Sequence, residues 1–369
     1  MRTLEAVELE DVARGAAVLG TGGGGDPYLG TLAALKSLHD FGPPRVIELE
    51  ELDDDAVVAL PFLVGSPVPF IEKFPLGQEL IDGYHALDRF LAGKLKAVMA
   101  AEIGGANSVV PLVVGSRLGV PIVDADCMGR AYPEVQLVTL TLHGISASPF
   151  ALADEHGNQV VLDTVDNFWA ERIARAAVVE FGAICAGMAY PVTGKQAKLA
   201  AIPGSLSYAQ RTGRALREAI AAKQDPIAAV LHETNGHVLF RGKIVDVQRR
   251  TQRGWALGEA TFAGFEADSG HQLVVQFQNE NLVAVLDGDI VASVPDLIAI
   301  LDADTGQAIT TERLRYGHRA VVLGIPCAPA WRTAAGLALG GPRHFGYEID
   351  YVPIEVRFAA APAATAGDR

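Results

Sequence analysis

A change in hydrophobic periodicity near residue 237 constrains the fold of this chain more than any other feature. Before residue 124, short runs rich in β-branched residues alternate with segments whose apolar residues recur at helical spacing. That alternation is typical of βαβ units around a parallel sheet. After residue 237 the runs are strand-like, and turn dipeptides such as Asp287-Gly288 separate them. We therefore predict an α/β N-terminal domain with a largely parallel sheet, followed by a C-terminal, mostly-β domain.

The chain has 369 residues, which is enough for two domains that each bury a core. We place the first domain at residues 1–165, where it carries a glycine-rich loop and an acidic cluster. The second domain spans residues 166–369 and is expected to be helical over 166–236 and all-β over 237–357. One expected helix ends at residue 20, and the others cover 27–39, 76–91, 107–118, 166–181, 205–222 and a short segment from 226; Ser205 is the expected cap of its helix. Expected strands cover 45–49, 56–64, 94–101, 120–123, 150–153, 160–162, 238–247, 255–262, 272–277, 282–286, 297–301 and 320–325, and those at 150–153 and 160–162 are expected to form a hairpin.

The charge balance limits the classes of partner. Lys and Arg total 30 and Asp and Glu total 44, so the formal net charge is −14. A chain of that sign repels phosphate backbones and anionic lipid headgroups. The longest apolar segment, residues 174–190, contains Glu180 and falls short of the roughly 20 residues that span a bilayer. We therefore expect no nucleic acid and no membrane as a partner, and a small-molecule substrate instead.

Cysteine usage and the first residues indicate the compartment. Cys127, Cys185 and Cys327 lie far apart and form no CxxC pair, which fits a reducing environment. Residues 1–5 lead directly into acidic positions and lack the apolar stretch of a secretory signal. We expect a cytoplasmic protein. The nine histidines show no HxH or HxxxH spacing, so a zinc site is not favoured.

The glycine run at residues 20–25 contains a literal GxGxxG. The dinucleotide fingerprint needs a strand before it, whereas a helix is predicted here, and Asp26 places a carboxylate where the phosphate would lie. We therefore expect no NAD. Two other interpretations stay open: a flexible helix–helix turn, or a loop that closes over a small ligand. In the second case Thr21, Gly22, Gly23 and Asp26 are the candidate contacts.

Acidic residues follow two predicted parallel strands at the edge where open α/β sheets bind ligands. Glu102 follows the strand at 94–101, and Asp124 and Asp126 follow the strand at 120–123. Such a cluster is typical of a general base whose pKa is raised by like charges, or of a divalent metal site. These three residues are our candidates for catalysis and, if a metal is present, for its ligands.

Other polar residues of the same segment are candidates for substrate binding. Gly104 and Gly105 permit a tight turn with available amides, and Asn107, Arg130 and Glu134 crowd the adjoining loops. The structural alternative is that Asn107 only caps a helix and that Arg130 pairs with Glu134 at i,i+4.

Two loops of the β part are also dense in polar residues. In residues 341–347, Arg343 has a fork that suits a carboxylate, and it is a candidate to line an interdomain pocket or else part of a tight turn. The run Gln278-Asn279-Glu280-Asn281 lies between two expected strands, and we interpret it as a simple turn.

Several of these segments, taken together and in order, resemble one family. They are residues 20–27 (GTGGGGDP), 102–107 (EIGGAN), 124–126 (DAD), 129–134 (GRAYPE), 278–280 (QNE), 294–298 (VPDLI), 341–343 (GPR) and 345–347 (FGY). The chain is similar to the S-methyl thiohydantoin desulfurase family, formerly a domain of unknown function, whose members also occur fused to hydantoinase/oxoprolinase-type proteins. The resemblance implies an α/β part followed by a mostly-β part, and a role in the metabolism of hydantoin-like or thiohydantoin-like rings. The family pattern has no fixed cysteine at Cys127, which argues against a nucleophilic cysteine.

The leading hypothesis is an enzyme that hydrolyses or desulfurises a small cyclic amide-like ring. A carboxylate from Glu102, Asp124 or Asp126, with or without a metal, would activate water for attack on C2 of a thiohydantoin and expel sulfide or a methylthiol. The alternatives are a non-catalytic ligand-binding subunit that partners a hydantoinase-type enzyme and, more weakly, a nucleotide-dependent enzyme. We also expect a homo-oligomer, because the chain combines many apolar residues with few aromatics.

Overall fold

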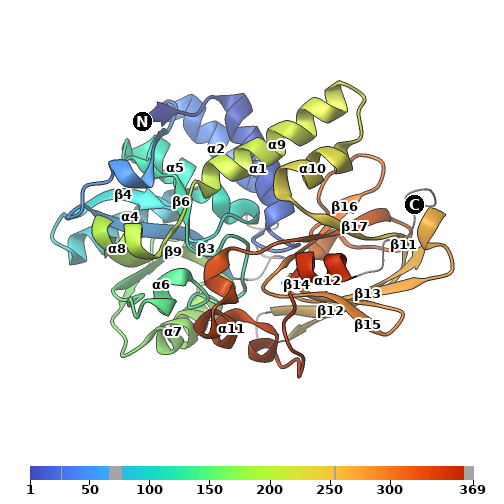
Figure 1. Cartoon of the computed structure of the whole chain (residues 1–369). Coiled ribbons are helices and arrows are strands. Elements are labelled where there is room, and N and C mark those ends of the chain that lie inside the picture. The colour runs from blue at the N-terminus through green and yellow to red at the C-terminus, as the bar shows by residue number, and fades with distance from the viewer. Residues whose placement is uncertain (26, 66–76, 253–254, 361–369) are drawn as a thin grey trace.

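The computed structural model describes residues 1–25, 27–65, 77–252 and 255–360 (Figure 1). It has an α/β part and an antiparallel β part that lie side by side, which confirms the predicted fold class. Asp26 lies outside the described residues. None of the helices in the described ranges is long and apolar enough to cross a membrane.

The α/β part is built on one mixed, eight-stranded sheet in the order β1-β2-β5-β4-β3-β9-β7-β8. The strands are β1 (Arg2–Thr3), β2 (Arg45–Ile47), β3 (Val57–Gly65), β4 (Leu95–Met99), β5 (Ile122–Val123), β7 (Phe150–Ala153), β8 (Gln159–Leu162) and β9 (Ile184–Thr193). The run β2-β5-β4-β3 is parallel, as the strand–helix alternation predicts, and the flanking strands pair antiparallel. The carboxyl ends of the parallel strands therefore share one edge.

Helices surround this sheet. They are α1 (Ala6–Leu19), α2 (Pro27–Phe41), α4 (Gln78–Phe90), α5 (Val110–Leu118), α6 (Thr139–Leu142), α7 (Asn167–Glu180), α8 (Gly194–Ala200), α9 (Ser205–Ala221) and α10 (Pro226–Thr234). The 3-10 helix η2 (Gly105–Ser108) precedes α5. The expected hairpin forms from β7 and β8, and Asp166 and Asp225 cap α7 and α10 through their side chains.

One predicted cap is wrong. Ser205 was expected to cap α9, but it is the first helical residue, and Gly204 is the N-cap with a φ of +70°. Glycine adopts that left-handed conformation at little cost. The amide of Ser207 instead donates to Oδ1 of Asp124, the residue after β5, at 3.0 Å. The helix start is thus capped from another part of the chain, which local sequence does not reveal.

Residues 166–236 pack on the first 165 residues rather than apart from them. Strand β9 lies between β3 and β7 in the sheet, and α9 lies along α1 (Figure 1). The two helices touch at glycines: a Cβ on Gly15 would lie 1.8 Å from the carbonyl oxygen of Ala209, and a Cβ on Gly213 would lie 1.9 Å from that of Asp11. The α/β sheet is therefore complete only with β9.

The β part is a seven-stranded antiparallel sheet in the order β15-β14-β13-β12-β11-β17-β16. Its strands are β11 (His237–Gln252), β12 (Trp255–Gly264), β13 (Gln272–Gln278), β14 (Glu280–Leu286), β15 (Asp289–Ser293), β16 (Leu297–Asp302) and β17 (Arg319–Ile325). Phe240, Phe262 and Phe277 form its core with Ile354 of α12 (Ile354–Ala360). Sequence periodicity missed β15, α12 and α11 (Ala334–Gly340), each of which is seven residues or fewer.

Candidate active site

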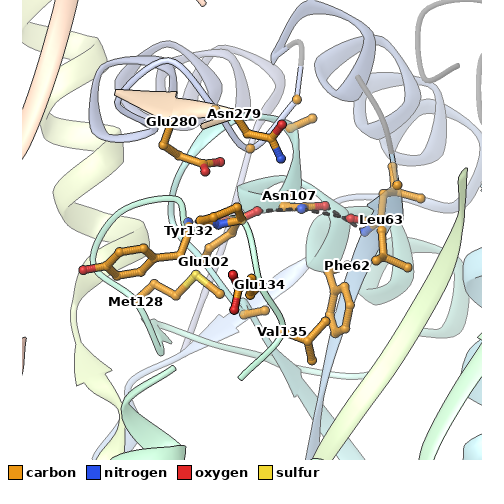
Figure 2. Close-up of a pocket in the computed structure, with 18 of the residues that line it drawn as sticks. Phe62, Leu63, Glu102, Asn107, Met128, Tyr132, Glu134, Val135, Asn279 and Glu280 are labelled. Atoms are coloured by element: carbon orange, nitrogen blue, oxygen red, sulfur yellow. Dashed lines mark hydrogen bonds between the residues drawn. The ribbon is translucent and has the colours of Figure 1, made fainter. Parts of the chain in front are cut away.

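A cavity opens where the carboxyl ends of β3 and β4, the glycine loop and the start of β14 meet (Figure 2). Its volume is about 110 Å³, and an engineered apolar cavity of about 150 Å³ accepts benzene. The space therefore suits a single five- or six-membered ring. The wall combines apolar and polar side chains, among them Phe62, Leu63, Val135, Val138, Ile184 and Tyr190, and Glu102, Asn107, Glu134, Arg175, Glu280 and Glu312.

Glu102 is held in this cavity by one hydrogen bond to each carboxyl oxygen. Nδ2 of Asn107 donates to Oε1 at 2.6 Å, and the backbone N–H of Tyr132 donates to Oε2 at 3.2 Å. Burial raises the pKa of Glu102 to about 8, the two donors oppose that rise, and the charge of Asp126 adds to it. Glu102 is therefore a fixed carboxyl that ionises near neutral pH, as a general base requires.

Asn107 orients Glu102 and does not cap a helix. Its Oδ1 accepts the N–H of Leu63 at 2.8 Å, and its Nδ2 donates to the carbonyl of Leu63 at 3.2 Å as well as to Glu102. Helix α5 begins after Val109, without a side-chain cap. The amide therefore ties the end of β3 to the catalytic candidate.

Glu280 brings a carboxyl from the β part to the same cavity, whose wall also includes Glu134 and Glu312. Its side chain reaches from the start of β14 toward Glu102 (Figure 2). Glu280 is only 2% exposed, and its Oε2 has no hydrogen-bond partner among the described residues. Burial and the negative charge of Glu102 raise the pKa of Glu280 well above its ordinary value. Burial therefore favours the protonated form of Glu280, and one of its oxygens is left without a partner in the described part of the chain.

The glycine loop separates Glu280 from the turn after β4, and it has no room for side chains. A Cβ on Gly23 would lie 2.0 Å from Oε1 of Glu280, and a Cβ on Gly24 would lie 2.3 Å from the carbonyl oxygen of Gly104. Gly105, with a φ of +62°, packs equally closely on Gly24. Gly23, Gly24 and Gly25 line the cavity. Gly104 and Gly105, which we expected to contact substrate, support the loop from behind.

Asp124 is fully buried, and its carboxylate is used outside the cavity wall. Its Oδ1 accepts the amide of Ser207, its Oδ2 accepts the Ser207 hydroxyl, and Arg2 lies 3.9 Å from Oδ2. These partners place Asp124 at the start of α9. Its carboxylate accepts an N-terminal amide of that helix, and Asp124 is not among the residues that line the cavity.

Asp126 is also fully buried, and it organises the turns beside Glu102. Its Oδ2 accepts the amides of Ile103 at 2.9 Å, Met128 at 3.1 Å and Gly129 at 2.7 Å. Burial raises the pKa of Asp126 to about 6, and the three amides oppose that rise. Asp126 therefore positions the Glu102 turn from behind.

The three acids do not form the ligand set that the sequence suggested. Glu102 lines the cavity, whereas Asp124 accepts the amide and hydroxyl of Ser207, and Oδ2 of Asp126 accepts three backbone amides. Within the described ranges, no three His, Cys, Asp or Glu side chains are placed to hold one metal ion.

Arg130 is fully buried and joins the two parts of the molecule. Its Nη1 donates to the carbonyls of Pro295 and Asp296, at 2.8 and 3.1 Å, and its Nη2 donates to Thr21 Oγ1 at 3.0 Å and to the carbonyl of Asn281 at 3.3 Å. With Nε bound to its neighbour's carbonyl at 3.0 Å, its five N–H groups meet five acceptors. Arg130 therefore fixes the glycine loop and does not pair with Glu134.

Two further substrate-binding candidates, Thr21 and Gly22, belong to the glycine loop itself. Thr21 is fully buried, and Gly22 packs on Thr311, whose N–H donates to the carbonyl of Gly22 at 2.9 Å. Neither Thr21 nor Gly22 lines the cavity. Asp26 lies outside the described residues.

Arg343 lies at the surface and pairs with Asp350 at 2.8 Å. Its side chain is 63% exposed, so it does not line the cavity as we had expected for one interpretation of its loop. Its neighbour His344 instead approaches Glu134, with Nε2 3.3 Å from Oε2. Glu134 does line the cavity.

Sequence reasoning missed Glu280 and Arg175. Asn279 has a φ of +57°, so the segment does turn as predicted, but that turn directs the next side chain into the cavity. The QNE segment among the family signatures was the available signal. Arg175 belongs to α7, where its Nε donates to Glu171 at 2.9 Å and its Nη2 to the carbonyl of Pro133 at 3.2 Å. No local motif marks it.

Comparisons with known proteins agree with this architecture. The model of the S-Me-THD-like N-terminal domain matches residues 7–164, and that of the S-Me-THD-like C-terminal domain matches residues 165–354. A crystal structure of a protein from Chromobacterium violaceum has a TM-score of 0.79 and 24% sequence identity, over 96% of this chain and 100% of that one, which shows a shared fold. A search of the curated proteins gave no match. The two family models together cover almost the whole chain, and the chain therefore belongs to the S-Me-THD-like, or S-methyl thiohydantoin desulfurase, family.

Proposed function

We propose that this protein is an enzyme that hydrolyses the C2–sulfur bond of a hydantoin-like ring, converting a thiohydantoin or its S-methyl derivative into the hydantoin. The observation that carries the proposal is Glu102, a buried carboxyl fixed by Asn107 and Tyr132 in a cavity of single-ring size. The family name supports the same substrate class.

The reaction begins with the activation of water by Glu102. Ionised Glu102 accepts a proton from water while the water oxygen bonds to C2 of the ring. In the S-methyl compound the π electrons of C2=N move to the ring nitrogen, and in unsubstituted 2-thiohydantoin those of C2=S move to sulfur. Glu102 then returns the proton to the atom that received the electron pair. The product of this step is a neutral tetrahedral carbon that carries a hydroxyl and the sulfur substituent.

The cavity supports this chemistry in two further ways. Phe62, Val135 and Ile184 supply apolar wall, which limits water and strengthens electrostatic interactions inside. Asp124 and Asp126 act at a distance from the ring, through α9 and through the turn that carries Glu102. In this proposal Glu102 is the catalytic base and these two residues are positioning residues.

The test is an assay of the purified full-length chain with S-methyl thiohydantoin and unsubstituted 2-thiohydantoin. We expect release of methanethiol and sulfide, respectively, and incorporation of one ¹⁸O from labelled water at C2 of the hydantoin. The metal content of the same preparation is measured in parallel. Glu102→Gln should lower kcat by at least about 10²-fold, which is the usual contribution of a general base.

The alternative role of a ligand-binding subunit makes a different prediction. In that case the purified chain binds the ring compounds without turnover, and release of sulfur begins only when a hydantoinase-type partner is added. Unchanged turnover in Glu102→Gln would also contradict the proposal, provided that the variant has the circular dichroism spectrum of the parent chain.

A further inference from the structure

Glu280 also lines the cavity, and its carboxyl has no role in the water-activation step. Unlike Glu102, it comes from the β part and begins strand β14. Oε1 of Glu280 rests against Gly23, and Oε2 is buried without a partner among the described residues. A buried polar oxygen that lacks a partner costs free energy. An unpartnered carboxyl oxygen at a cavity wall is therefore a candidate to bind or react with a ligand in that cavity.

The hydrogen bonds around Glu102 and Glu280 differ, and this difference indicates which of the two carboxyls holds a proton. Both oxygens of Glu102 accept hydrogen bonds, from Asn107 and Tyr132, and such donors favour the ionised form. On Glu280, the backbone amides of Glu280 and Gly24 and the charge of Arg130 lower the pKa, but they are outweighed by burial, and Oε2 has no partner among the described residues. When Glu102 is ionised, its negative charge opposes a second charge on Glu280. The pair therefore holds one proton, and Glu280 carries it.

We propose that Glu280 is the general acid of this site and donates its proton to the sulfur that leaves C2. This inference rests on the proposed function, and it adds the group that completes the reaction. It also means that the α/β part supplies the base and the β part supplies the acid.

The step balances as follows. The C2–S bond breaks and its electron pair goes to sulfur, which takes the proton of Glu280 and departs as methanethiol, or as hydrogen sulfide from an unsubstituted thiohydantoin. A lone pair of the C2 hydroxyl oxygen forms the C2=O bond, and the hydroxyl proton passes to ionised Glu102. Proton transfer from Glu102 to Glu280, directly or through one water, then restores both groups.

Arg130 helps to hold Glu280 in place relative to Glu102. It binds the carbonyl of Asn281, next to Glu280, and the hydroxyl of Thr21 in the glycine loop. The N–H of Asn281 also donates to the carbonyl of Thr21 at 2.8 Å. Because these contacts join β14 to the loop, the carboxyl of Glu280 is fixed relative to Glu102 although the two belong to different domains.

Leaving-group dependence tests the proposal. We would compare S-methyl thiohydantoin with S-(2,2,2-trifluoroethyl) thiohydantoin, which adds no second ring and whose departing thiolate is a much weaker base that depends less on a proton. Glu280→Gln should lower kcat by about 10²-fold or more for the S-methyl compound and by less than about tenfold for the S-trifluoroethyl compound. Glu218→Gln, the same change on the exposed face of α9, should lower neither.

The parent chain provides a second measurement, which does not depend on how Glu280→Gln folds. The pH profile of kcat for the S-methyl compound should fall at high pH, as Glu280 loses its proton, whereas the profile for the S-trifluoroethyl compound should fall much less. Equal losses for the two compounds in Glu280→Gln, or alkaline limbs of the same size in the parent chain, would overturn the role of Glu280. Failure of the parent chain to release thiol from either compound would instead overturn the proposed function itself.

Discussion

Gly23 and Glu280 touch across the boundary between the two parts of the molecule. A Cβ on Gly23 would lie 2.0 Å from Oε1, 2.5 Å from Cδ and 2.6 Å from Cγ of Glu280. The absence of a side chain at residue 23 therefore determines where the carboxyl of Glu280 lies. This contact links the glycine run at residues 20–25 to the chemistry proposed for the cavity.

Gly23→Ala should displace Glu280 without altering either carboxyl. We expect kcat for S-methyl thiohydantoin to fall by about 10²-fold, because a shift of about 1 Å in a catalytic group costs that much. The control is Gly83→Ala in α4, where a Cβ would meet only the Cβ of Ala153 at 3.9 Å. That variant should keep parental kcat, and activity of the same level in Gly23→Ala would contradict the positioning role of the contact.

The pH dependence of kcat/KM should report Glu102. Burial raises the pKa of Glu102 to about 8, and the base works only when ionised, so kcat/KM should rise with pH up to about 8. Glu280→Gln should leave this acidic limb in place, because the hydrogen-bond donors on Glu102 make it the carboxyl of the pair that ionises first. Initial rates between pH 5 and pH 10 check both statements. A limb centred near pH 4.5 would show that Glu102 is not the titrating base.

Asn107→Ala should move that limb to higher pH. The amide of Asn107 donates to Oε1 of Glu102 and thereby lowers its pKa, so its loss leaves burial less opposed and the pKa rises further. Loss of both bonds to Leu63 should also cost about 1–3 kcal/mol of unfolding free energy. Asn158→Ala, in the β7–β8 turn, removes an amide that bonds Asp154 and should leave the limb unchanged.

Glu102→Gln should make the fold less sensitive to pH. The folded-state pKa of Glu102 lies above that of the unfolded chain, so its contribution to stability is fully present below about pH 4.5 and is lost as pH rises through about 8. The loss in the parent chain is at most about 1.4 kcal/mol per pH unit over that interval. Glutamine does not titrate. Thermal melts at pH 5 and pH 9 should therefore show a smaller drop in Tm for the variant, and equal drops would mean that Glu102 is not buried as described.

Asp124→Asn separates a positioning role from a catalytic one. Asp124 accepts the amide and the hydroxyl of Ser207 at the start of α9, so the variant should lose about 1–3 kcal/mol of unfolding free energy. Its kcat, measured well below its melting temperature, should stay within about threefold of the parental value. A 10²-fold loss of kcat in a fully folded variant would return Asp124 to the catalytic group.

Hydrophobic periodicity predicted most of the longer helices and strands but missed several of the shortest ones. The alternation before residue 124 predicted the parallel strands and their helices, and the strand-like runs after residue 237 predicted a mostly-β part, which the structure shows to be one antiparallel sheet. Strand β15 (Asp289–Ser293) and helix α11 (Ala334–Gly340) are too short to show a clear period. Pairing was also beyond reach, because β9 inserts between β3 and β7 through contacts that are distant in sequence.

The candidate site was predictable as a region but not as a set of roles. Glu102 and Asn107 follow β4, and the rule for the edge of a parallel sheet locates them. Asp124 also follows a parallel strand, but its carboxylate lies outside the cavity wall because it accepts the amide of Ser207 at the start of α9. Which amide is within reach of a carboxylate depends on how the elements pack.

The sequence by itself determined the order of helices and strands, the change from an α/β part to a β part, and the edge at which polar groups collect. These follow from local periodicity and from the conformational freedom of glycine. Only the tertiary structure decided that Glu280 faces Glu102, that Arg130 is a fully buried link and that Asp124 and Asp126 serve as structural anchors. The physical reason is that burial and hydrogen-bond partners set the protonation and role of an ionisable group, and both arise when distant segments pack together.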